Sequence, residues 1–124
     1  MRYLILIQSN ERSAKLWEQL TAEQQTAFGP AHRRLTEQMQ AAGVLVSSEG
    51  LADPAKATWV SVRDGETIAS DGPFAEVKEH LAGFYLIDVE GPDEAIAWAA
   101  KVPDAALLNE VEVRPVLDMS GWDL

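Results

Sequence analysis

Residues 84–89 read Phe-Tyr-Leu-Ile-Asp-Val, and residues 3–7 read Tyr-Leu-Ile-Leu-Ile. Both runs are rich in the aromatic and branched side chains that favour β-strands. Successive strand residues point to opposite faces of a sheet, so a run that is apolar throughout buries both of its faces. These two segments therefore predict the central strands of a sheet that is covered on both sides.

Further strands are predicted around this centre. A strand is expected to start at 44–46, another covers 58–63 with alternating polarity, and the last covers 111–116. Asp64-Gly65 is a strong hairpin signal, which joins 58–63 to a short strand at 66–69.

Helical patterns separate these strands. The spacing of Thr21 and Gln24 is that of a capping box. Gly29-Pro30 is expected to interrupt this helix, and Pro30 to begin another that ends at Gly43. A later helix follows Gly91-Pro92 and stops at Pro103, and a short helical stretch is expected over 75–81.

The resulting order is strand, helix, paired strands, central strand, helix, strand, over a single domain of residues 1–124. It is typical of an α+β, ferredoxin-like βαββαβ fold with an antiparallel sheet. Two helices cover only one face of such a sheet. We therefore expect a homodimer in which two sheets pack together, although residues 13–28 could instead fold over the second face.

The composition narrows the possible functions. The 124 residues include 20 acidic and 10 basic ones, giving a formal charge of −10, which disfavours nucleic-acid binding. There is no cysteine, as is compatible with a cytoplasmic protein. The apolar start of five residues is too short for a membrane span or a signal sequence. We expect no cofactor, since no phosphate-binding glycine loop occurs.

Residues 71–79 read Asp-Gly-Pro-Phe-Ala-Glu-Val-Lys-Glu. This run resembles the signature of the YCII-related family, in the branch named for its DGPF motif, with Val77 in place of the usual threonine. The similarity extends over nearly the whole chain, including the ending Val111-Glu112-Val113-Arg114-Pro115-Val116. It implies a ferredoxin-like fold dimerised into an α+β barrel, and most of the family has no established activity.

The same resemblance implies a candidate catalytic pair. Pro30-Ala31-His32 is similar to a helix start in the wider family, where a histidine has been proposed to pair with an aspartate, and Asp71 is the matching aspartate. An imidazole can move protons near neutral pH when a carboxylate fixes its tautomer. The alternative is that His32 lies partly in water and Asp71 caps the following helix.

The loop that contains Phe74 could close over a ligand, with Lys78 or Arg114 binding an anionic group. Alternatively, Phe74 fills the core and Arg114 pairs with Glu112. A metal site at residues 76, 79 and 80 is less well supported than ion pairing on a helix face, so no metal is expected.

Two functions follow from these patterns. The first is a dimeric module that binds a small molecule or a regulatory partner, and the second is a cofactor-free enzyme that uses His32 and Asp71 for proton transfer on a small cyclic or carbonyl-bearing substrate.

Overall fold

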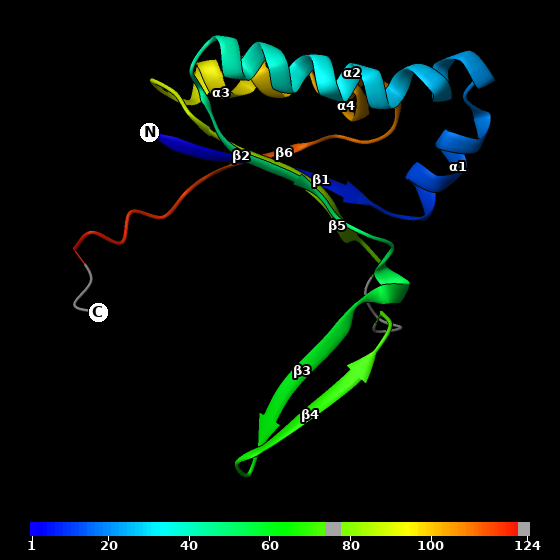
Figure 1. Cartoon of the computed structure of the whole chain (residues 1–124), viewed down its shortest axis with the longest axis vertical. Coiled ribbons are helices and arrows are strands. Elements are labelled where there is room, and N and C mark those ends of the chain that lie inside the picture. Colours follow the sequence, from blue (N-terminus) through cyan, green and yellow to red (C-terminus); the bar gives the residue numbers. More distant parts are fainter. Residues whose placement is uncertain (74–77, 122–124) are drawn as a thin grey trace.

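The computed structural model describes residues 1–73 and 78–121 as a mixed α+β fold, as predicted (Figure 1). Four antiparallel strands form the main sheet in the order β2-β5-β1-β6, and they are β1 (Arg2–Ser9), β2 (Leu45–Gly50), β5 (His80–Asp88) and β6 (Glu112–Pro115). The helices are α1 (Glu11–Gln19), α2 (Ala22–Ala41), α3 (Pro92–Ala99) and α4 (Pro103–Leu107).

The two apolar runs occupy the centre of the sheet, as their sequence predicts. β1 pairs with β5 in a register that places Tyr3 opposite Ile87 and Ile5 opposite Tyr85. These four side chains point toward the helices and are buried. They form the core with the remaining buried apolar residues, which are Ile7, Leu35, Met39, Val44, Val89, Ala95, Ala99 and Val102.

The opposite face of the sheet is also apolar, and none of the described helices lies across it (Figure 1). Leu4 pairs with Leu86 and Leu6 pairs with Phe84, and all except Leu6 are only half-buried. We call these four residues the open face. The idea that residues 13–28 cover it is wrong, because Trp17 packs edge-on against Phe28 of α2, on the helical side.

Helix α2 differs from the prediction, because it continues through Pro30 as one helix of 20 residues. Proline lacks an N–H, so the helix forgoes one backbone hydrogen bond at this point. Packing offsets this loss, since Leu35 and Met39 on the same helix are buried against the sheet. The capping box at Thr21 and Gln24 forms as predicted.

The helical stretch expected over 75–81 is wrong at its end. His80 and Leu81 belong to β5, which also contains Gly83. A Cβ atom at Gly83 would lie 2.9 Å from the carbonyl oxygen of Glu49 on β2, so the two strands approach closely here. Residues 74–77 lie outside the described part of the chain.

The Asp64-Gly65 hairpin is confirmed. It joins β3 (Thr58–Arg63) to β4 (Glu66–Asp71), and both turn residues have positive φ, 53° and 79°. The two strands do not join the main sheet and form a ribbon of their own after a short 3₁₀ turn, Pro54–Lys56. This ribbon, which we call the hairpin arm, projects away from the helices (Figure 1).

Candidate functional site

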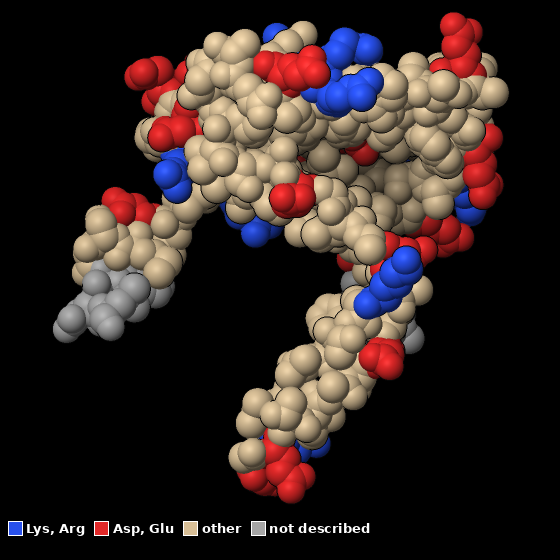
Figure 2. Space-filling view, viewed as in Figure 1, with Lys and Arg blue, Asp and Glu red and all other residues tan. Residues whose placement is uncertain are grey.

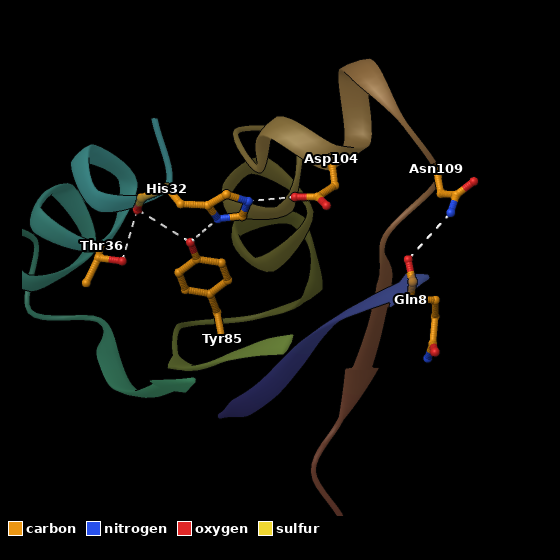
Figure 3. A network of polar contacts seen from close by, with 6 residues as sticks. All are labelled: Gln8, His32, Thr36, Tyr85, Asp104 and Asn109. Atoms are coloured by element: carbon orange, nitrogen blue, oxygen red, sulfur yellow. Dashed lines mark hydrogen bonds and ion pairs between the residues drawn. The ribbon is translucent and has the colours of Figure 1, made fainter. Parts of the chain in front are cut away.

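The described structure brings His32 together with two side chains from distant parts of the chain. His32 lies on α2, and its Nδ1 is 2.6 Å from the hydroxyl of Tyr85 on β5. Its Nε2 is 2.7 Å from Oδ1 of Asp104 on α4. Figure 3 shows the imidazole held between the two partners. The three groups therefore form one continuous hydrogen-bonded chain.

The partners decide which ring nitrogen carries the proton of the neutral imidazole. An ionised carboxylate only accepts hydrogen bonds, so Nε2 must donate to Asp104. Nδ1 then has a free lone pair and accepts from the Tyr85 hydroxyl. Burial raises the pKa of Tyr85 above its usual value of 10.0, which keeps the phenol protonated and able to donate at neutral pH.

A pocket of about 410 Å³ lies beside this chain of hydrogen bonds, and His32, Tyr85 and Asp104 line it. The hollow is visible between the helices and the strands in Figure 2. Phe28 meets the His32 ring edge-on with centroids 5.1 Å apart, so the wall near the imidazole is aromatic. The other lining residues are Ile7, Arg33, Thr36, Ser48, Glu49, Gly50, Ala82, Gly83 and Phe84.

The expected pairing of His32 with Asp71 is contradicted by this geometry. Both ring nitrogens of His32 already have partners, and Asp71 instead accepts a hydrogen bond of 3.2 Å from Thr58 at the base of the hairpin arm. The capping role considered for Asp71 involves residues 74–77, which lie outside the described part of the chain. Asp104 is the carboxylate that orients the histidine.

Sequence reasoning missed Asp104 and Tyr85. Asp104 follows Pro103 at a helix start, a place where an ordinary first-turn acid also occurs, so its sequence context does not distinguish it. Tyr85 carried a weak signal, because it is a hydroxyl-bearing residue in a strand that is otherwise apolar, and a buried tyrosine hydroxyl needs a partner.

The predicted ligand-binding residues do not line the His32 pocket among the residues described. Arg114 donates to Glu112 at 2.6 Å, as the alternative interpretation expected. Lys78 lies near Asn10 and Arg12, in a separate shallow depression. Phe74 lies outside the described residues.

The metal site considered at residues 76, 79 and 80 assumed that these residues share one helix. This assumption is wrong, because His80 begins a strand. Within residues 1–73 and 78–121, no group of three or more side chains is arranged to hold a metal ion. The described helices also include none that is both long and apolar enough to cross a membrane.

Comparison with known proteins agrees with the resemblance seen in the sequence. Residues 1–120 match the YCII-related domain. The chain belongs to the YCII-related family. It is 35% identical over 118 residues to the uncharacterized protein R00369 of Rhizobium meliloti (strain 1021). The aligned residues cover 94% of this chain and 92% of that protein. This relative is named only as an uncharacterized protein.

Proposed function

We propose that this YCII-related protein binds a small organic molecule in the His32 pocket and transfers a proton to or from it without a cofactor. The observation that carries this proposal is the 2.7 Å hydrogen bond between His32 and Asp104 at the wall of a pocket of about 410 Å³. Pockets of this size suit small ligands, and a histidine fixed by a carboxylate is a common acid–base group.

The proton has a defined route in this proposal. A proton leaving the bound molecule forms a bond to the Tyr85 hydroxyl oxygen while the proton that Tyr85 already carries moves to His32 Nδ1. The bound molecule becomes an anion and the imidazole becomes an imidazolium. Asp104 stabilises that positive charge through Nε2. The reverse transfer returns a proton to the product, and Tyr85 is neutral before and after each step.

The lining of the pocket favours a particular class of molecule. Phe28 provides apolar surface for a small ring, and Ile7 adds to it. Arg33 is exposed at the pocket and makes no ion pair with the described carboxylates, so it is available to an anionic substituent. A small cyclic compound that carries a carbonyl group fits these features, because the carbonyl acidifies the neighbouring C–H bond.

A non-catalytic binding or regulatory role is the second candidate. One observation favours it, namely that both nitrogens of His32 are satisfied within the protein. In that role the polar chain would shape the pocket and would move no proton.

Hydrogen–deuterium exchange separates the two candidates. A panel of small cyclic ketones and keto acids is incubated with the protein in D₂O, and loss of the α-proton signal is followed by NMR. We expect exchange of at least one compound, which the His32→Ala variant does not catalyse. The control is His80→Ala, since His80 is the only other histidine and lies outside this pocket. Binding without exchange by the wild-type protein would favour the second candidate.

We also propose that the fold is ferredoxin-like, that the chain belongs to the DGPF branch and that it forms a homodimer through the open face. The strand order β2-β5-β1-β6 supports the first point. Residues 71–73 support the second, and the apolar pairs Leu4–Leu86 and Leu6–Phe84 support the third. Light scattering during gel filtration tests the dimer, because it measures the mass independently of shape.

A further inference from the structure

The hairpin arm carries apolar side chains that its own chain leaves exposed. All twelve residues of β3 and β4 are exposed, and the exposed fractions reach 65% at Val60, 69% at Val62 and 41% at Ile68. An isolated two-stranded ribbon is at best marginally stable in water. The arm therefore needs a surface to pack against, and the helical body of its own chain does not provide it (Figure 1).

The total accessible surface is larger than that of a compact monomer of this mass. The chain exposes 8713 Å², whereas a compact monomer of 13.6 kDa exposes roughly 6,600 Å² by the usual scaling with mass. The excess is roughly 2,000 Å², which is in the range that each partner of an obligate dimer buries. The arm and the exposed residues 116–121 both contribute to this excess, and an interface with one other chain of similar size would bury surface of this order.

We propose that the arm of each chain packs against a second copy, on the side of its sheet that carries the open face. Each of the two copies then contributes its arm to the interface. The inference rests on the proposed homodimer and adds the element that builds it. The arm projects on the side of the sheet that faces away from the helices, which is the side of the open face (Figure 1). One two-fold axis then satisfies both arms and both open faces at once.

One side of the arm suits this contact better than the other. Val60 and Val62 share a side with their cross-strand neighbours Ala69 and Thr67, and none of the four is charged. The one carboxylate on this side, Asp71, lies at the base of the arm and accepts a hydrogen bond from Thr58. The charged residues Arg63 and Glu66 lie on the other side, close to the turn. An uncharged contact matters in a chain with a net charge of −10, because two copies repel each other at long range.

Cysteine cross-linking tests the exchange directly, because the chain has no cysteine. One variant carries Ala69→Cys on the side of the arm that holds Val60 and Val62, and a second carries Ser47→Cys, whose register partner is Leu86 of the open face. The two variants are mixed, allowed to exchange subunits and treated with a short bismaleimide. Only a contact between copies can join Cys from the two variants, and we expect this cross-linked product. In the control, the Ala69→Cys variant is mixed with a Gln38→Cys variant in place of the Ser47→Cys variant. Gln38 is exposed on α2.

The affinity of the dimer provides a second test. We expect Val62→Asp to weaken dimerisation at least about tenfold, from the lost burial of one valine alone. Ile96→Asp is the matched control. Ile96 is 56% exposed on α3, and this substitution adds one negative charge as Val62→Asp does. If the wild-type protein is dimeric, but the mixed cysteine variants do not cross-link and Val62→Asp leaves the affinity of the dimer unchanged, the arm exchange is overturned and the dimer stands. A monomeric wild-type protein would overturn both.

Discussion

Asp104→Asn is the substitution that tests the candidate site most directly. It keeps the shape of the side chain and removes the negative charge that faces His32 Nε2 at 2.7 Å. The two side chains are largely buried, with 12% of Asp104 and 25% of His32 exposed, so water screens this interaction only partly.

The expected loss follows from the type of hydrogen bond. A bond to a charged group contributes about 1.5–3 kcal/mol, and a neutral one about 0.5–1.5 kcal/mol. An asparagine oxygen can still accept from Nε2, so we expect unfolding to require about 1 kcal/mol less. For a chain of this length, that corresponds to a Tm lower by about 4 °C.

Asp93→Asn is the matched control, because the loss of an acid at a helix start has its own small effect. Asp93 follows Pro92 on α3 as Asp104 follows Pro103 on α4. Among the described residues, Asp93 makes no side-chain hydrogen bond. The difference between the two variants therefore isolates the bond to His32.

Urea unfolding at neutral pH measures both variants, and ¹⁵N NMR of the imidazole identifies the protonated nitrogen in the wild-type protein. His80→Gln assigns the spectrum, since the chain has only two histidines. We expect the proton on Nε2. A proton on Nδ1 in the neutral ring, or an Asp104→Asn variant as stable as Asp93→Asn, would refute the proposed chain of hydrogen bonds.

Two further predictions concern the central strand β5. The pKa of Tyr85 is raised by burial, so its contribution to stability is complete below its unfolded pKa of 10.0 and is lost as the pH rises through the higher folded pKa. Urea unfolding from pH 9 to 11 should therefore show a shallower alkaline loss of stability for Tyr85→Phe than for the wild type, and equal slopes would contradict this. Gly83→Ala should cost about 1–3 kcal/mol, because its Cβ would lie 2.9 Å from the Glu49 carbonyl oxygen. Gly50→Ala, at the paired position where a Cβ meets nothing within 4 Å, should cost clearly less in the same assay.

Local patterns in the sequence were sufficient for much of the fold. The apolar runs at 3–7 and 84–89 identified the two central strands, because a run that is apolar throughout favours the centre of a sheet, where strands on both sides pair with it. Asp64-Gly65 identified its hairpin, because few residue pairs adopt two successive positive φ angles. In these cases the physical cause lies within a few neighbouring residues.

Other features depended on contacts that neighbouring residues do not encode. Helix α2 continues through Pro30 because the packing of residues such as Met39 outweighs one lost hydrogen bond. His32 was recognised as a site residue, but its carboxylate partner was not, since Asp104 lies 72 residues further along and reaches His32 only when α4 packs beside α2. The sequence by itself determined which segments are strands and which faces are apolar, whereas the tertiary structure decided which polar groups meet. Hydrogen-bond partners are selected by distance in space, and distance in space is set by the whole chain.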